Sequence, residues 1–345
     1  MYAELILQMG DTYPELLKQR DFVEKTLRLE EEQFAKTLER GLQILDNALD
    51  KLQGKVISGA TVFKLYDTYG FPADLTADIA RERGLTIDIE GFDKSMAEQR
   101  TRAQQANNFG VDYNKGLKFD EKTQFLGYGY LQHGAIVSIL VQDGKLVPCL
   151  KEGDKGQVVL NQTPFYAESG GQVGDGGILV LKEGIFTVTD TKKSGDTYLH
   201  IGYVSRGSIN VLDNVHAEVD SEQRKEIALH HSATHLLHAA LRLVLGEHVV
   251  QKGSLCDANK LRFDFSHTEA LSNETLEKVN YLVNNAIREN SSVLTNLTSI
   301  DDAKAAGAMA LFGEKYDEIV RVVSMGEFST ELCGGTHTTR TGNMG

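Results

Sequence analysis

The sequence has no tryptophan and only three cysteines among its 345 residues. Cys149, Cys256 and Cys333 lie far apart and form no C-x-x-C pair, so we expect no disulfide framework and a reducing, cytoplasmic compartment. No apolar run approaches the roughly 20 residues that a membrane-spanning helix needs. The first residues also lack the basic start and cleavage site of a signal peptide. A membrane protein and a disulfide-stabilised secreted domain are therefore not expected.

Positive charge is scarce as well. The chain has 36 Lys and Arg residues against 49 Asp and Glu residues, which gives a formal net charge of −13. This balance argues against a protein that coats nucleic acid without specificity, but it leaves room for a specific RNA site on a local basic face. At roughly 150 residues per domain, the length predicts two or three domains. The oligomeric state stays open.

The pattern along the chain changes twice, which predicts an α+β multidomain protein. Residues 1–115 show helical spacing of apolar residues and are expected to form a helical domain. Residues 123–219 contain many short strands, including a hairpin with Asp143-Gly144 at its turn, and predict a small β-barrel. Residues 220–345 mix helices and strands and predict an α/β core. Both ends suggest a piece of a longer protein, with the last domain cut at its C-terminus.

Two stretches of the last domain carry metal-binding chemistry. The stretch HHSATHLLH, 230–238, places His231 and His235 four residues apart in a predicted helix, hence on one face. The stretch ELCGGTH, 331–337, adds Cys333 and His337. Zinc usually takes four nitrogen or sulfur ligands, so the two stretches could share one ion. Each motif alone is weak, and Ser232 replaces the Glu that a zinc protease would need. For the neighbouring histidines, His230 and His238, ordinary solvated or hydrogen-bonded roles are favoured over ligation.

Four motifs in one order identify the chain as a member of the alanyl-tRNA synthetase family over essentially its whole length. They are YDTYGFPADLT (66–76), TPFYAESGGQVGD (163–175), HSATH (231–235) and CGGTH (333–337). The chain resembles the internal part of that enzyme: the end of the tRNA-recognition helical domain, the β-barrel and the editing core. The editing core is also similar to free-standing alanyl-tRNA deacylases and to the editing domain of threonyl-tRNA synthetase. The ATP-binding class II catalytic domain and the C-terminal tRNA-binding domain of the family are expected to lie outside this chain.

The resemblance implies roles for individual residues. It puts a zinc ion on His231, His235, Cys333 and His337, and it places Thr234, Gln251 and Ser254 in the editing pocket. It gives Glu168 and Gln172 a supporting role in the YAESGGQ loop, and it implies that Asp67 helps to read a G·U pair in the tRNA acceptor stem. Each has a plainer alternative. Thr234 could bond its own helix backbone, Gln251 and Ser254 could be polar strand ends, the loop could be a simple turn, and Asp67 could cap a helix or be solvated.

The resemblance also implies a reaction and a partner. The partner is tRNA(Ala), especially its acceptor stem and aminoacylated 3′ end, and the reaction is hydrolysis of mischarged seryl- and glycyl-tRNA(Ala). A second site is needed because one methylene or one hydroxyl in a small apolar pocket changes binding by only about 1–3 kcal/mol. Whether zinc acts in catalysis or organises the pocket stays open. Three alternatives remain: a chain that binds tRNA without catalysis, the ligase itself, for which no ATP-binding motif is seen, and a zinc-stabilised structural domain.

Overall fold

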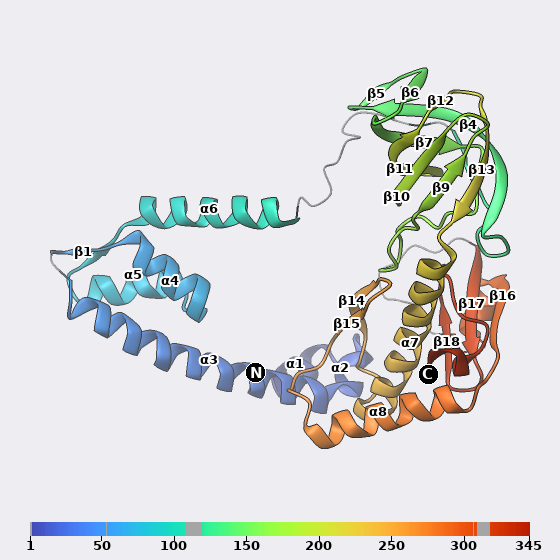
Figure 1. Ribbon diagram of the computed structural model, residues 1–345. Coiled ribbons are helices and arrows are strands. Elements are labelled where there is room, and N and C mark those ends of the chain that lie inside the picture. The colour runs from blue at the N-terminus through green and yellow to red at the C-terminus, as the bar shows by residue number, and fades with distance from the viewer. Residues whose placement is uncertain (1, 53, 108–118, 120, 306, 309–317) are drawn as a thin grey trace. The chain divides into compact units, whose positions relative to one another are not determined.

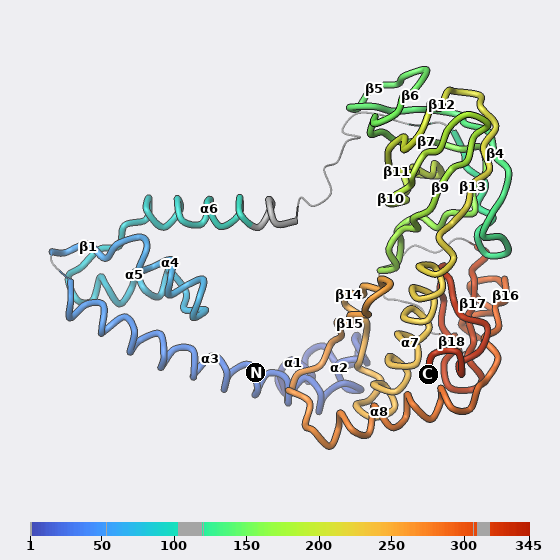
Figure 2. Tube along the Cα trace, in the orientation of Figure 1, coloured from blue at the N-terminus to red at the C-terminus, as the bar shows by residue number. Residues whose placement is uncertain are grey.

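The computed structural model describes residues 2–52, 54–107, 119, 121–305, 307–308 and 318–345. The chain divides into two compact units, Met1–Asp112 and Tyr113–Gly345 (Figures 1 and 2). Among the described residues, no helix combines the length and the apolar character that crossing a membrane requires.

The first unit is helical where the apolar spacing predicts helices. Its two short strands, β1 and β2, pair in parallel. The elements are α1 (Tyr2–Met9), α2 (Pro14–Lys18), α3 (Arg20–Leu49), β1 (Val56–Ile57), α4 (Gly59–Tyr69), α5 (Ala73–Glu82), β2 (Thr86–Ile87) and α6 (Ile89–Asn107).

The core of this unit is built on α3 and α4. Leu45 and Leu65 are fully buried, and Phe71 packs directly on Gly41. A Cβ atom at Gly41 would lie 2.0 Å from the Phe71 ring, so only glycine leaves room for that ring. Gly70 ends α4 with a φ of 68°, a left-handed conformation that favours glycine. The YGFP turn thus places Phe71 in the core.

The second unit begins with a closed β-barrel, as the short strands predict. Six strands follow one another in the order β13-β9-β10-β11-β7-β4, and β4 pairs with β13 to close the ring. The predicted hairpin is present between β4 and β5, with Asp143 and Gly144 at φ values of 49° and 72°. The strands of this region are β3 (Gln124–Phe125), β4 (Gln132–Gln142), β5 (Lys145–Leu146), β6 (Cys149–Lys151), β7 (Lys155–Leu160), β8 (Gln162–Thr163), β9 (Gly177–Val180), β10 (Ile185–Ser194), β11 (Thr197–Arg206), β12 (Ser208–Asn210) and β13 (Asn214–Val219).

The barrel interior is largely apolar and also holds the buried His200. Leu140, Leu160 and Phe186 are fully buried inside the barrel. His200 is also fully buried, and its Nδ1 lies 2.9 Å from the Val158 carbonyl, to which it donates. Its Nε2 lies 2.7 Å from the hydroxyl of Thr163, from which it accepts. Burial lowers the pKa of His200 to about 4, so the ring is neutral in the folded protein.

The rest of the second unit surrounds the long helix α7 (Ser221–Leu245). Figure 1 shows α7 between a hairpin of β14 (Gln251–Cys256) and β15 (Leu261–Phe265) and a sheet of β16 (Val293–Ser299), β17 (Ile319–Met325) and β18 (Ser329–Leu332). The remaining elements are α8 (Asn273–Arg288), α9 (Ile300–Ala305) and a short 3-10 helix, Thr341–Met344. The sequence did not predict β16, and residues 306 and 309–317 lie outside the described residues.

Candidate metal centre and cavity

Helix α7 is fixed at its first turn. The Asp220 carboxylate caps the helix by accepting from the Gln223 amide at 3.0 Å. One turn later, the buried Arg224 guanidinium donates through Nε to both oxygens of the buried Asp175 carboxylate, at 2.9 and 3.0 Å. Arg224 also donates to the carbonyls of Gly127 and Pro164, each at 2.9 Å. These bonds tie the helix to loops of the barrel.

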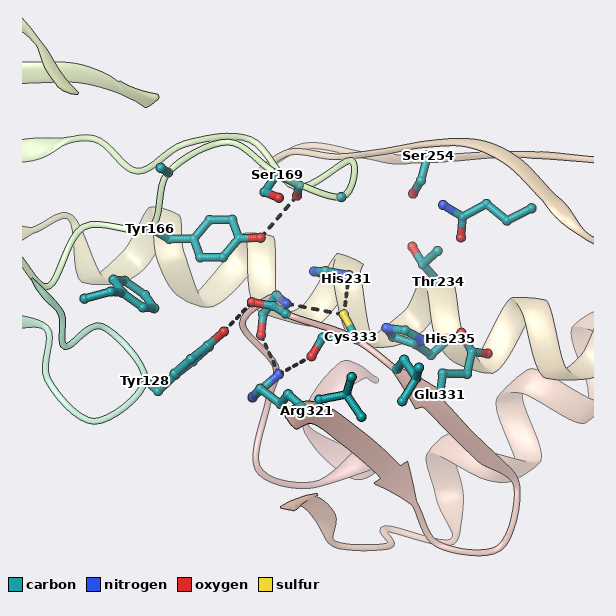
Figure 3. Close-up of a pocket in the computed structure, with 18 of the residues that line it drawn as sticks. Tyr128, Tyr166, Ser169, His231, Thr234, His235, Ser254, Arg321, Glu331 and Cys333 are labelled. Carbon is teal, nitrogen blue, oxygen red and sulfur yellow. Dashed lines mark hydrogen bonds and ion pairs between the residues drawn. The ribbon is translucent and has the colours of Figure 1, made fainter. Parts of the chain in front are cut away.

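His231 and His235 lie on one face of α7, and the ELCGGTH turn brings Cys333 and His337 to them. The four ligand atoms all lie within 4.8 Å of one another. The Cys333 sulfur is 3.4 Å from His231 Nε2 and 3.3 Å from His337 Nε2. Figure 3 shows His231, His235 and Cys333 around one point. The two stretches singled out in the sequence therefore meet in space.

Each of the three imidazoles is oriented through its Nδ1 atom. The partners are Gln172 Oε1 for His231 at 2.8 Å, Glu331 Oε2 for His235 at 2.7 Å, and Ser232 Oγ for His337 at 3.2 Å. The Nε2 atoms of the three histidines are thus available as metal ligands at the centre of the cluster. Nε2 of His235 is buried and has no hydrogen-bond partner among the described residues. Ligand histidines in metal sites are typically held in this way by a second hydrogen bond.

The CGGTH turn requires glycine at one position, and hydrogen bonds to its backbone hold it in place. A Cβ atom at Gly335 would lie 2.0 Å from the His231 ring. The Gly335 amide donates to the Cys333 sulfur at 3.3 Å, and Gln172 Oε1 accepts from the Thr336 amide at 2.9 Å. Arg321 donates through Nη1 to the carbonyls of Cys333 and Gly335, at 2.9 and 2.8 Å. The ligands therefore sit on a preformed turn.

The protonation states within the cluster are coupled. Burial would lower the pKa of His235, but the neighbouring Glu331 and Cys333 raise it well above its ordinary value. Burial alone would raise the pKa of the Cys333 thiol, but the neighbouring His231 and His235 hold it well below its ordinary value. Burial lowers the pKa of His337 to about 3, which leaves its imidazole neutral. Burial would raise the pKa of Glu331, but His235 lowers it to about 2. A metal binds a thiolate and neutral imidazoles, so His235 would give up its proton when a metal binds.

The donor set and its spacing fit zinc. Tetrahedral nitrogen and sulfur ligands about 2.0–2.3 Å from zinc lie roughly 3.3–3.7 Å from one another. The distances from the Cys333 sulfur to His231 and His337, 3.4 and 3.3 Å, match this spacing. Three imidazoles and one thiolate are borderline-soft donors, which suit zinc rather than magnesium or calcium.

A cavity of about 590 Å³ opens beside the cluster. Figure 3 shows Tyr128 and Tyr166 on one side of Cys333, and Thr234 and Ser254 on the other. The predicted site residues Thr234, Gln251 and Ser254 all line this cavity. The Thr234 hydroxyl also donates to the backbone carbonyl of His230 at 2.9 Å, so it bonds its own helix as well as facing the cavity.

The other predicted residues lie elsewhere or play a different part. Gln172 is fully buried beneath the cluster, whereas the exposed Glu168 pairs with Lys192 at 3.5 Å and is not among the described residues that line the cavity. Asp67 belongs to α4 in the first unit, where its exposed carboxylate accepts from Gln99 Nε2 at 2.6 Å.

Sequence reasoning missed Glu331, and it left His238 as an ordinary hydrogen-bonded histidine. Glu331 accepts from His235 and also from His238 Nδ1, at 3.1 Å. A signal for Glu331 was present, because this carboxylate stands two residues before Cys333 in the ELCGGTH stretch, and ligand histidines commonly bond a carboxylate. The structure agrees that His230 and His238 make hydrogen bonds, since His230 Nδ1 lies 2.8 Å from the Asp257 carbonyl.

Comparison with known proteins assigns the family. Residues 1–223 match the model of tRNA synthetases class II (A), and residues 320–345 match that of the threonyl and alanyl tRNA synthetase second additional domain. The chain belongs to the class II (A) tRNA synthetase family. Curated alanine–tRNA ligases of Psychromonas ingrahamii and Pseudoalteromonas translucida are 70% and 56% identical to it over its whole length. That of Idiomarina loihiensis is 57% identical over 99% of the chain.

These matches confirm the resemblance inferred from the four motifs. The chain spans about 40% of the length of the first two of these relatives and 39% of the third. The second matched model covers β17, β18 and the CGGTH turn, which are the elements that carry Glu331, Cys333 and His337.

Proposed function

We propose that this chain hydrolyses seryl- and glycyl-tRNA(Ala) in the cavity beside the His231–His235–Cys333–His337 cluster. The observation that carries the proposal is the convergence of these four ligand atoms, within 4.8 Å, at the wall of that cavity. In this proposal, residues 220–345 form the editing core and residues 123–219 its barrel. Residues 1–115 belong to a tRNA-recognition region.

The four side chains would hold one zinc ion. Such an ion polarises an ester carbonyl or activates a water when it has an open position, and it organises the surrounding pocket when four protein ligands close it. The four converging ligands favour the organising role. Gln172, Glu331 and Ser232 would then keep the three imidazoles in place, since each bonds one Nδ1 atom.

Recognition of serine would fall to the polar groups of the cavity. Thr234 and Ser254 offer hydroxyls and Gln251 an amide, so together they can donate to and accept from a serine hydroxyl. Alanine has no hydroxyl, so its binding would leave these polar groups without a partner on the substrate. Sites of this kind discriminate by factors on the order of 10⁴ or more, whereas a bare apolar pocket reaches only about a hundredfold.

The reaction itself needs little beyond a positioned water. Water adds to the ester carbonyl, the bond to the terminal ribose oxygen breaks, and that oxygen takes the proton to become a hydroxyl. The products are the free amino acid and uncharged tRNA. The hydroxyls of Thr234 and Ser254 and the tRNA's own neighbouring hydroxyl would orient the water in the cavity.

The first unit would contribute to tRNA binding. Asp67 is exposed on α4, and its carboxylate is oriented by the Gln99 amide. A fixed acceptor of this kind suits hydrogen bonding to base edges of an acceptor stem.

The experiment that tests the function compares hydrolysis of seryl-tRNA(Ala) and alanyl-tRNA(Ala) by the same sample, with its zinc content measured. We expect about one zinc per chain and hydrolysis selective for the seryl ester. Binding of tRNA with bound zinc but without hydrolysis would replace the proposed activity with a binding role. Absence of zinc and of tRNA binding would overturn the proposal altogether.

A further inference from the structure

The cavity beside the cluster has different chemistry on its two sides (Figure 3). The part lined by Thr234, Gln251 and Ser254 offers hydroxyl and amide groups, and it is the one that the proposed function uses. The other part is lined by rings from the barrel and its loops, together with one lysine (Figure 3 shows two of the rings). Its lining side chains are Phe125, Tyr128, Tyr166, Tyr198 and Lys193. We call this part the aromatic lobe.

The rings of the aromatic lobe form one connected cluster with Phe125 at its centre. Phe125 stacks on Tyr198 with ring centroids 5.6 Å apart and planes 12° apart, and it meets Tyr128 and Tyr166 edge-on. Tyr166 and Tyr198 are almost fully buried. The Tyr166 hydroxyl donates to the Ser169 carbonyl at 3.1 Å. The walls of this part are therefore aromatic rings that hold one another in place.

Lys193 brings a positive charge to this lobe. It stands directly across from Tyr198 in the β10–β11 hairpin, and its ammonium lies 5.2 Å from the centre of the Tyr198 ring. Its side chain is exposed, and no acidic partner within ion-pair distance occurs among the described residues. Its neighbour Lys192, on the alternate side of the strand, instead pairs with Glu168 and Asp190.

We propose that the aromatic lobe binds the terminal nucleoside of the tRNA, and that Lys193 binds the phosphodiester that precedes it. Flat aromatic walls accept a nucleobase, and a lysine beside them accepts the backbone phosphate, which is the combination that single-stranded nucleic acid sites use. With the nucleoside in this lobe, its aminoacyl ester reaches across the cluster to Thr234 and Ser254. The inference rests on the proposed function, because it assigns a binding site to the nucleotide part of the same aminoacyl-tRNA substrate.

Tyr128 defines the limit of this lobe. Its hydroxyl donates to the Gly334 carbonyl at 2.5 Å, and the Arg321 guanidinium lies 4.3 Å from its ring centre. Both contacts hold Tyr128 against the CGGTH turn. The ring thus separates the lobe from the backbone of the turn and is not itself free to move with the base.

The test uses two non-hydrolysable probes and the whole chain. One probe is the amide analogue of seryl-adenosine, and the other is the same analogue extended by one nucleotide through a phosphodiester. We expect Lys193→Ala to weaken binding of the extended probe about five- to tenfold and to leave the short probe unchanged, because only the extended probe carries the phosphate. Lys182 is an exposed lysine in the turn after β9 of the same barrel. Lys182→Ala is therefore the matched control, and it should change the affinity for neither probe.

The aromatic part is tested with Phe125→Ala and, as a variant that keeps apolar volume, Phe125→Leu. We expect both variants to bind both probes more weakly, by about tenfold for the alanine variant, with zinc content unchanged.

Equal effects of Lys193→Ala on the affinities for the two probes, or unchanged affinities in the Phe125 variants, would overturn the inference. If the wild-type chain binds both probes but hydrolyses no seryl-tRNA(Ala), the proposed function fails while the nucleoside site stands. If it hydrolyses seryl-tRNA(Ala) and the variants bind normally, the nucleoside site fails alone.

Discussion

Oε1 of Gln172 lies 2.8 Å from Nδ1 of His231, a residue 59 positions away in sequence. The same oxygen accepts from the Thr336 amide at 2.9 Å. The Gln172 amide group completes the contact by donating to the Thr336 hydroxyl at 2.8 Å. One glutamine from the YAESGGQ loop therefore aligns His231 of α7 with the CGGTH turn.

Replacing this glutamine should weaken zinc binding. Loss of an outer hydrogen-bond partner typically lowers metal affinity about 10–100-fold, and we expect Gln172→Ala to fall in that range. Competition with a chelator of known affinity would measure it. Gln162→Ala is the matched control, since Gln162 lies in the same barrel but bonds the Gly134 carbonyl instead. Equal zinc affinity in Gln172→Ala and wild type would contradict the supporting role of Gln172.

Replacing the only sulfur ligand should remove zinc and activity together. In Cys333→Ala, three imidazoles remain, and we expect zinc affinity to fall by more than about 100-fold because a charged first ligand matters more than an outer partner. Zinc content after gel filtration and the rate of seryl-tRNA(Ala) hydrolysis would be measured on the same sample. Cys149→Ala, in the barrel and away from the cluster, should keep both. Normal zinc content in Cys333→Ala would disprove the ligand set.

Replacing a cavity residue should separate binding of metal from catalysis. Gln251 lines the cavity but is not one of the four clustered ligands. We expect Gln251→Ala to retain about one zinc per chain and to lose about tenfold in kcat/KM on seryl-tRNA(Ala), the effect of one hydrogen bond to the substrate. Lys252→Ala, the exposed neighbour on β14, serves as control. An unchanged rate on the seryl ester would remove Gln251 from the site.

The buried His200 should make the stability of the barrel depend on pH. Its pKa is lowered to about 4 in the folded protein, against an ordinary value of 6.5. Between these values the unfolded chain binds more protons, so the free energy of unfolding falls as the pH falls. Below pH 4, His200 lowers the free energy of unfolding by a total on the order of 3 kcal/mol relative to neutral pH.

Hydrogen exchange of the barrel amides between pH 7 and pH 4.5 would measure this dependence, after correction for the intrinsic exchange rate. In His200→Gln the group is gone, and we expect a flatter profile on a lower absolute stability. His216→Gln, an exposed histidine of β13, should keep the wild-type slope. The same slope in wild type and His200→Gln would show that another group is responsible.

Local sequence patterns predicted the parts of the site that depend on spacing. The i, i+4 pair His231 and His235 needed only a helix, and Asp143-Gly144 needed only a tight turn. Glu331 was harder, because its role depends on β18 lying against α7. Strand β16 was missed because VLTNLTS lacks an alternating apolar pattern and four of its seven residues are exposed. Its place in the sheet comes from pairing with β17, which no local pattern encodes.

Long-range contacts account for most of what could not be predicted. The closure of the barrel joins β13 to β4, strands about 80 residues apart, and depends on register over the whole sheet. Asp175 and Arg224 look like ordinary surface charges in sequence, yet both are buried and paired. The aromatic lobe likewise combines Phe125 from one strand with Tyr198 from another. Such groupings follow from topology and not from neighbouring residues.

The bonds of Arg224 have a consequence for how the site would discriminate. If α7 slid or rotated against the barrel, Asp175 would keep a buried charge without its partner, which costs several kcal/mol. The distance between the aromatic lobe and the Thr234 wall is therefore set before any substrate arrives. In the proposed reaction, a nucleoside bound in the aromatic lobe fixes the distance that its amino acid can extend towards Thr234. The site would then select amino acids by the length and polarity of their side chains, because its walls are rigid. It would not need a lid that closes over the substrate.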